Sequence, residues 1–270
     1  MRFELTYTSR YFYAPPMTRG LTALRLRPRS RPGVEVLQAQ LRVNPGTISG
    51  TYVDGWETLV DLVECWEPHA AATFTVEALV ETDGQRRLTP PTPEERHLFA
   101  HDSSRVRSAA VASLDAALHL DRSRWEAIET ATAWIHQNFR YRVGVTAAET
   151  PVEQVVEHGE GVCQDFAHLL LALVRRWGWC ARYVSGYQFS GSGEEEQIMA
   201  EAMHAWVEVY RPDHGWFGLD ATTGAATDAH YIPVGAGRDY DDVPPIRGIL
   251  IGAGEQRQEA RLQIGRVPAQ

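Results

Sequence analysis

The chain has 270 residues, of which 44% are hydrophobic, enough to bury the cores of two domains or of one domain with a long extension. Its formal net charge of −9 and a pI near 5.6 argue against nucleic acid or an anionic membrane as the main partner. All 26 basic residues are arginine.

The N-terminus, MRFELTYTSRYFYAPP, alternates like a strand from its first residues and has no apolar run of signal-peptide length. No stretch approaches the roughly 20 apolar residues of a membrane span, so we expect no membrane partner. The cysteines are too few and odd in number for a disulfide framework: Cys65, Cys163 and Cys180. These features predict a protein of the reducing cytoplasm.

Residues 1 to about 85 show the period-two alternation of β-strands. Two runs show it most clearly: Leu37, Ala39, Leu41 and Val43, and later Phe74, Val76 and Ala78. Asp54-Gly55 predicts a hairpin turn between two such runs. Short antiparallel strands with closely spaced turns predict an N-terminal antiparallel β-sandwich over residues 1–87.

The segment LTPPTPEE breaks this pattern with its prolines, which predicts a linker over residues 88–96. Beyond it the apolar period becomes helical. Ser123 and Glu126 predict a capping box, and one helix face is lined by Trp125, Ile128, Thr132, Ile135 and Phe139. The chain therefore belongs to the α+β class, with a second domain at 97–270 that ends in C-terminal strands.

The stretch GVCQDFAHLLLALVRRWG places Cys163 in the first turn of an amphipathic helix, after a glycine that the chain needs for a sharp turn. Unpaired backbone N–H groups and the positive end of the helix dipole stabilise a thiolate there. Cys163 is therefore a candidate nucleophile, and its own backbone N–H is a candidate oxyanion donor. The alternative is a buried structural cysteine.

Two strand-like runs follow: MHAWVEVY has His204 near its start, and WFGLD ends at Asp220. A cysteine at a helix N-terminus that faces a histidine and an aspartate on adjacent strands is a thiol acyl-transfer triad. His204 takes the thiol proton and returns it to the leaving amine, while Asp220 fixes the imidazole tautomer. Alternatively, His204 is a hydrogen-bonded strand-start histidine and Asp220 caps the turn ATTG.

Four neighbouring residues have weaker assignments. Gln164 is a candidate for orienting substrate, and Tyr141 lines the substrate cleft or the oxyanion site, or is simply an aromatic core anchor. Asp165 is expected to be structural, because a carboxylate is favourable in any first helical turn. His168 lies around 140° from Cys163 on the helix, which predicts a core histidine.

The loop SGSGEEEQ, residues 190–197, is interpreted as a solvated loop or as a mobile acidic rim next to the strand of His204. We expect no metal and no cofactor. The chain has no C-x-x-C or H-E-x-x-H pair and no calcium-binding loop, and Cys163 and His168 are poorly spaced to share a metal on one helix.

The motifs GVCQDFAH, HAWVEV and GLD resemble the core of the transglutaminase-like superfamily, specifically its bacterial branch. GRDYDDVPPIRG, residues 237–248, is similar to a segment typical of that branch, and the resemblance extends to about residue 252. It implies a papain-like core with the nucleophile at a helix N-terminus packed on an antiparallel sheet. The family usually has proline after the aspartate, whereas this chain has Ala221, which removes rigidity from the turn but no catalytic side chain.

The resemblance implies that Cys163 attacks a carboxamide of a peptide or protein substrate and forms a thioester. Water as the acceptor gives a peptidase or deamidase, and a primary amine gives a true protein-glutamine amine transferase. Bacterial members are more often associated with proteolysis, so we expect amide hydrolysis, with amine transfer as the alternative and a catalytically degenerate peptide-binding scaffold as a second one. A chain without lysine offers no side-chain amine for linkage to itself, and the sequence carries no signal of oligomeric state.

Overall fold

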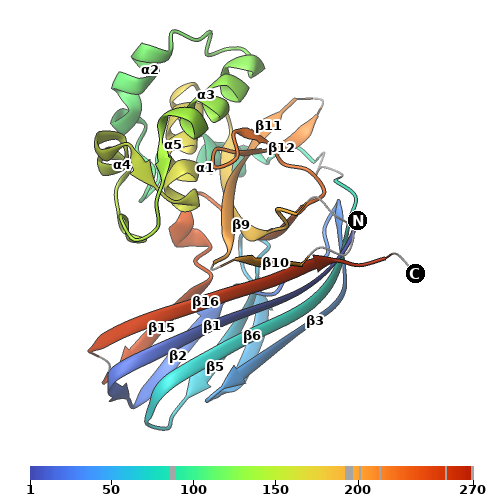
Figure 1. Cartoon of the computed structure of the whole chain (residues 1–270). Helices are drawn as coiled ribbons and strands as arrows, with labels where there is room; N and C mark the ends of the chain where they lie inside the picture. The colour runs from blue at the N-terminus through green and yellow to red at the C-terminus, as the bar shows by residue number, and fades with distance from the viewer. Residues whose placement is uncertain (85–88, 192–196, 201, 213, 253, 269–270) are drawn as a thin grey trace.

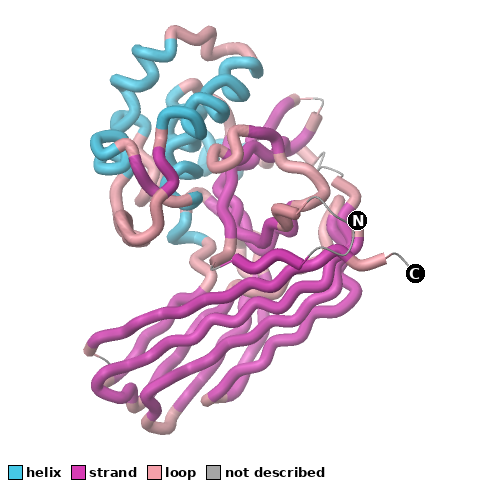
Figure 2. The backbone as a smooth tube through the Cα atoms, in the orientation of Figure 1, coloured by secondary structure: helices cyan, strands magenta, loops and turns pink. Residues whose placement is uncertain are grey.

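The computed structural model describes the chain except for residues 85–88, 192–196, 201, 213, 253 and 269–270. Long strands fill the lower part of the molecule in Figure 1, and the helices gather at the other end around a second, smaller sheet. Figure 2 shows the same separation by colour, with the helices at one end only. The α+β class predicted from the sequence is confirmed.

The lower part is a sandwich of two antiparallel sheets. The first has the order β10 (Gln197–Ala200), β16 (Glu255–Arg266), β1 (Arg2–Met17), β6 (His69–Thr82) and β3 (Val34–Asn44). The second has the order β15 (Ile246–Ile251), β2 (Arg19–Leu24), β5 (Leu59–Cys65) and β4 (Thr47–Val53). Their apolar faces share one core, in which Leu5 of β1 and Val63 of β5 are buried.

The strand pattern read from the sequence holds for most of this sandwich. The inward-facing residues predicted in β6 are all buried: Phe74, Val76 and Ala78. The turn predicted at Asp54-Gly55 connects β4 to β5. Leu37 is the exception, since a bulge between Val36 and Gln38 shifts the register of β3 and leaves Leu37 41% exposed.

The second part of the chain supplies the helices. They are α1 (Pro93–Ala100), α2 (Ala112–Leu118), α3 (Trp125–Asn138), α4 (Val152–His158) and α5 (Cys163–Arg176), with short 3₁₀ turns η1 (Ser108–Val111) and η2 (Tyr240–Asp242). In the described parts of the chain, none of the helices is long and apolar enough to span a membrane. The apolar face predicted for α3 is buried: Trp125, Ile128, Thr132 and Ile135, with Phe139 buried just after the helix.

The capping box predicted at Ser123 and Glu126 is wrong. Helix α3 starts without a side-chain cap, because the Ser123 hydroxyl donates to Asp121 at 2.7 Å. A capping box is present instead at Thr92 and Glu95, where the threonine side chain accepts from the Glu95 N–H and the glutamate accepts from the Thr92 N–H. Helix α1 therefore begins inside the segment 88–96 that the prolines predict to be a linker.

Helix α5 lies at the centre of the upper part, against an antiparallel sheet. The order of that sheet is β13 (Ala225–Ala226), β12 (Gly215–Asp220), β11 (His204–Arg211), β9 (Ala181–Gln188) and β14 (Tyr231–Gly237). All residues of α5 from Asp165 to Arg175 are buried. A short parallel pair, β7 (Arg140–Tyr141) and β8 (Glu160–Gly161), lies just before α5.

The last two strands of the chain hydrogen-bond to the sandwich. β15 pairs with β2, and β16 pairs with β1 in a register that places Arg266 opposite Phe3. These ladders satisfy backbone groups that β1 and β2 would otherwise leave unpaired at a sheet edge. The boundaries 1–87, 88–96 and 97–270 stay a prediction for the folding units, but the hydrogen bonding of the sheets crosses them.

Candidate active site

Cys163, His204 and Asp220 occupy the ends of three elements that meet at one edge of the upper sheet. Cys163 is the first residue of α5, His204 is the first residue of β11, and Asp220 is the last residue of β12. Because β11 and β12 are antiparallel neighbours, the start of one lies beside the end of the other. Helix α5 packs against β11, which brings its first turn to the same edge.

Gly161 has no side chain, which lets the backbone at the turn into α5 approach the buried carboxylate of Asp165 closely. A Cβ at this position would lie 2.8 Å from both Cβ and Oδ2 of Asp165. That oxygen accepts hydrogen bonds from the Val162 N–H at 2.8 Å and the Thr146 hydroxyl at 2.7 Å. Asp165 therefore caps the helix that presents Cys163, which agrees with its predicted structural role.

Asp220 holds the imidazole of His204 by a short hydrogen bond, with 2.8 Å between Nε2 and Oδ2. The carboxylate is fully buried, and its Oδ1 accepts from the Thr222 N–H at 2.8 Å. Burial acts to raise the pKa of Asp220, but the hydrogen bond to His204 and the positive charge of that histidine hold the pKa of Asp220 below its ordinary value. Asp220 thus both caps the ATTG turn and hydrogen-bonds to the histidine, and its catalytic role stays a prediction.

The Cys163 side chain lies close enough to His204 to act on the pKa of its imidazole. Since Nε2 is bound to Asp220, Nδ1 is the ring nitrogen left for the sulfur. Burial acts to lower the pKa of His204, but the hydrogen bond to Asp220, the interaction with Cys163 and the charges of both groups raise it to about 10. At neutral pH the imidazole is therefore protonated next to the half-buried side chain of Cys163.

Tyr141 also lies near Cys163. The parallel pairing of Tyr141 with Gly161 places it next to the start of α5. Burial and the neighbouring Cys163, to which its hydroxyl hydrogen-bonds, raise the pKa of Tyr141 to about 12. Its ring packs edge-on against Phe166, and the residue is 50% exposed. Tyr141 is therefore both an aromatic anchor and part of the surface around the thiol.

The two other residues singled out on α5 have different surroundings. The Gln164 amide donates to the Ala148 carbonyl at 3.0 Å, so it fastens the preceding loop, and its role toward substrate stays a prediction. His168 is 1% exposed, its Nε2 accepts from the Tyr240 N–H at 3.2 Å, and burial lowers its pKa to about 4. The prediction of a core histidine is confirmed, and the lowered pKa keeps its imidazole neutral at pH 7.

Cys163 differs from the other two cysteines in exposure. Cys65 and Cys180 are buried, and all three are free thiols. Burial raises the pKa of Cys180 to about 11, and the Cys65 sulfur lies 3.3 Å from Nδ1 of His69. The only described cysteine that is partly open to solvent is therefore the one at the start of α5.

Residues 237–248 fasten the upper part of the molecule to the sandwich. Within this motif the guanidinium of Arg238 donates two hydrogen bonds to Asp242, at 2.9 and 2.8 Å, and it lies over the ring of Trp56 in the sandwich. Asp241 binds Arg105 in the same bidentate manner, at 2.7 and 3.1 Å. The motif leads directly into β15, so its arginine and aspartates have a structural role.

Tyr231 is a residue of the site that the sequence patterns do not indicate. It begins β14, and its hydroxyl donates to Oδ2 of Asp220 at 2.8 Å. The sequence offers only an aromatic residue at the start of a strand, which is typical of many strands. Its place at the site depends on how β14 pairs with β9.

Four sequence expectations concern other features than these contacts. Residues 192–196, most of the loop interpreted as an acidic rim, lie outside the described residues. Among the residues that the structure does describe, no three His, Cys, Asp or Glu side chains form a group that could hold a metal ion. The absence of cofactors and the cytoplasmic location stay predictions.

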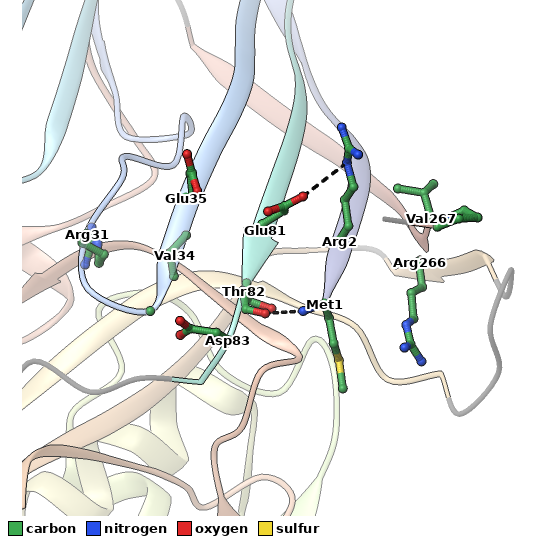
Figure 3. Close-up of a pocket in the computed structure, with 12 residues that line it drawn as sticks. Met1, Arg2, Arg31, Val34, Glu35, Glu81, Thr82, Asp83, Arg266 and Val267 are labelled. Atoms are coloured by element: carbon green, nitrogen blue, oxygen red, sulfur yellow. Dashed lines mark hydrogen bonds and ion pairs between the residues drawn. The ribbon is translucent and has the colours of Figure 1, made fainter. Parts of the chain in front are cut away.

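A cavity of about 700 Å³ lies at one end of the sandwich (Figure 3), and none of the three candidate residues lines it. Charges of both signs alternate around it. Arg2 lies 3.8 Å from Glu81, and the N-terminal amine of Met1 donates to the Thr82 carbonyl. This cavity is therefore separate from the candidate site at Cys163.

Comparison with known proteins identifies the family. Residues 3–81 match the family described as bacterial transglutaminase-like N-terminal region, and residues 113–221 match the transglutaminase-like superfamily. An uncharacterized protein of Mycobacterium leprae is 30% identical over 284 residues, which cover 98% of this chain and 99% of that protein. The chain belongs to the transglutaminase-like superfamily.

Two further comparisons concern the fold and the core. A solved structure from Cytophaga hutchinsonii, described as a candidate cysteine protease, has a TM-score of 0.79 at 21% identity and covers 100% of this chain and 92% of its own. The two proteins share a fold. A protein-glutamine gamma-glutamyltransferase of Pseudomonas aeruginosa is 29% identical over 98 residues, 34% of this chain and 15% of that protein.

Proposed function

We propose that this protein transfers acyl groups from peptide or protein carboxamides, with Cys163 as nucleophile, His204 as general base and acid, and Asp220 as the residue that orients the imidazole. One observation carries the proposal: the buried Asp220 hydrogen-bonds to His204 at 2.8 Å, and the Cys163 side chain is near enough to act on the pKa of the same imidazole. The transglutaminase-like family supports thiol-dependent acyl transfer in general.

The proposed chemistry proceeds in two halves. The Cys163 thiolate attacks the carboxamide carbon, and the protonated His204 gives its proton to the departing amine as the C–N bond breaks, which leaves a thioester. His204 then removes a proton from the acceptor as its oxygen or nitrogen attacks the thioester. The C–S bond breaks, the thiolate is restored, and the product is an acid or a new amide.

The start of α5 supports stabilisation of the oxyanion formed in each half. As the first helical residue, Cys163 has a backbone N–H without an intrahelical carbonyl partner, and this N–H adjoins the reacting sulfur. The positive end of the helix dipole adds to the same field. Tyr141, whose hydroxyl already contacts the sulfur, is the nearest side-chain donor for the same purpose.

We propose water as the main acceptor, so that the reaction is amide hydrolysis. A thioester that must wait for a bulky amine needs a cleft from which water is excluded. The half-buried Cys163 and the 50% exposed Tyr141 beside it support access of water to the intermediate. The alternative, amine transfer, is supported by the similarity to the Pseudomonas aeruginosa protein-glutamine gamma-glutamyltransferase.

The test is mass spectrometry of a diverse peptide pool incubated with the enzyme, with and without a millimolar primary amine. Hydrolysis gives cleavage products or a deamidation shift of about one dalton, and amine transfer gives adducts, all from the same thioester. Cys163→Ala is the control and should give none of these products. If amine adducts outnumber hydrolysis products, the protein is a transglutaminase and not a hydrolase. If the wild type and Cys163→Ala give equal spectra, the protein is a catalytically degenerate scaffold.

A further inference from the structure

Asp220 binds two side chains through the same oxygen. Oδ2 accepts the hydroxyl of Tyr231 at 2.8 Å and lies 2.8 Å from Nε2 of His204. The other oxygen, Oδ1, accepts the Thr222 N–H. With donors on both oxygens, the buried carboxylate is fixed in the plane that directs Oδ2 at the imidazole.

The proton of the Tyr231 hydroxyl is directed at Asp220 by a second residue. The side-chain amide nitrogen of Gln188 donates to the Tyr231 oxygen at 2.8 Å, and the two residues are paired across β14 and β9. An amide nitrogen only donates, so the tyrosine oxygen accepts from Gln188 and its own proton is free for the carboxylate. The hydrogen bonds therefore run in one direction, from Gln188 through Tyr231 to Asp220.

The ring of Tyr231 is held independently of its hydroxyl. It packs edge-on against Trp206, with 5.2 Å between the ring centroids, and Trp206 is 1% exposed. Trp206 is also stacked next to His204, at 6.3 Å. A phenylalanine at position 231 would keep this packing and remove only the hydroxyl.

We propose that Tyr231 is a positioning residue that orients Asp220 and shares its negative charge, and so sets how strongly His204 holds its proton. The inference rests on the proposed function. A carboxylate that also accepts a hydroxyl proton holds an imidazolium less tightly than one that does not. Tyr231 thus keeps His204 able to give its proton to the leaving amine, while the carboxylate keeps its direction.

The groups that surround this proton come from four elements. Asp220 on β12 and Cys163 on α5 contact His204, Tyr141 on β7 hydrogen-bonds to Cys163, and Tyr231 on β14 binds Asp220. Asp228, in the turn before β14, acts on Tyr231 through its charge, and the Thr223 hydroxyl bonds to it. A change in the titration of His204 could arise from any of these groups. The test therefore uses variants that remove one hydroxyl at a time.

The test is the pH dependence of Cys163 alkylation by iodoacetamide in the full-length protein, which needs no substrate. In Tyr231→Phe the pH at which the imidazolium loses its proton should rise by on the order of half to one unit. With a peptide substrate identified, kcat should fall about tenfold while KM changes less than about twofold. Tyr7→Phe is the matched control, since it removes the hydroxyl of another buried tyrosine, which bonds Ser9 in the sandwich, and should leave the profile unchanged.

A Tyr231→Phe profile that coincides with that of the wild type overturns the proposal, and so does an equal shift in Tyr7→Phe. If Tyr231→Phe does not fold, Gln188→Leu is measured instead. That variant leaves the tyrosine a weaker donor, so its profile should shift in the same direction by a smaller amount, and no shift refutes the proposal. A shifted profile in a protein that turns over no peptide supports the role of Tyr231 and refutes the proposed function.

Discussion

Replacement of Asp220 by asparagine removes the charge beside His204 and keeps the size of the side chain. The amide oxygen can still accept the Thr222 N–H, but the amide NH₂ then faces two groups that donate to the wild-type carboxylate, His204 and the Tyr231 hydroxyl. Nε2 of His204 must then accept a hydrogen bond. A neutral imidazole in that state carries its proton on Nδ1, toward the sulfur, and cannot take a proton from Cys163.

The size of the effect follows from the titration of His204. Its pKa is about 10 with the carboxylate present, and burial alone would lower it below the usual value of about 6.5. Loss of the carboxylate removes the Asp220 interactions that raise this pKa and leaves those of Cys163, so the protonated fraction at about pH 7.5 should fall. With the wrong tautomer added, we expect turnover to fall on the order of a hundredfold or more.

The assay is kcat/KM at about pH 7.5, together with the rate of Cys163 alkylation and a thermal melt. Asp61→Asn is the matched control, because Asp61 is 1% exposed and hydrogen-bonds to Arg27 in the sandwich, away from the site. That variant should lose stability and keep full specific activity. If the activity of Asp220→Asn stays within about threefold of the wild type, Asp220 is not part of the triad. If Asp220→Asn and Asp61→Asn both lose activity in parallel with stability, the loss of activity is a consequence of impaired folding.

A small alkylating agent at neutral pH should label Cys163 well before the buried Cys65 and Cys180, and equal labelling of all three in the folded protein would refute the nucleophile assignment. Gly161→Ala should displace Asp165 and destabilise the protein by about 1–3 kcal/mol in a thermal melt. Gly55→Ala is the control and should not destabilise it, because a Cβ at position 55 would meet nothing within 4 Å. Equal melting temperatures of the two variants would contradict the argument from close approach at Gly161. Because folding raises the pKa of His204 from about 6.5 to about 10, the native state binds more protons between these values. The stability that His204 contributes is therefore fully present below about pH 6.5 and is lost as the pH rises through about 10. The denaturant midpoint of the wild type should decline over this range, and the decline should be smaller in His204→Gln. An equal decline in both proteins would contradict the pKa argument.

The elements that carry the candidate triad could be predicted because their signals are local. A glycine and a cysteine before an amphipathic run predict the start of α5, and strand alternation predicts the start of β11 and the end of β12. Each signal lies within a few residues of the side chain concerned. The order of the motifs then identifies the family, which supplies the expectation that the three ends meet.

Two of the features that were missed depend on residues far away in the chain, and a third depends on a competing local hydrogen bond. Tyr231 reaches Asp220 only because β14 pairs with β9. The bulge that exposes Leu37 depends on the register of β3 against β6. Ser123 and Thr92 both precede a glutamate by three residues, and they differ because Asp121 accepts the serine hydroxyl, a competition that the capping pattern does not include.

The pairing of β1 with β16 determines the order in which the sandwich can be completed during synthesis. β1 lies between β6, which the ribosome makes soon afterwards, and β16, which it makes after the other described strands. Helix α5 and the sheet it packs on are complete in sequence before β16 emerges, so the upper part can fold while one edge of β1 is still open. An open, regular edge is a template for another strand. A chain that stops before residue 255 therefore exposes β1 to pairing with a second copy, and self-association should increase in chains shortened from the C-terminus.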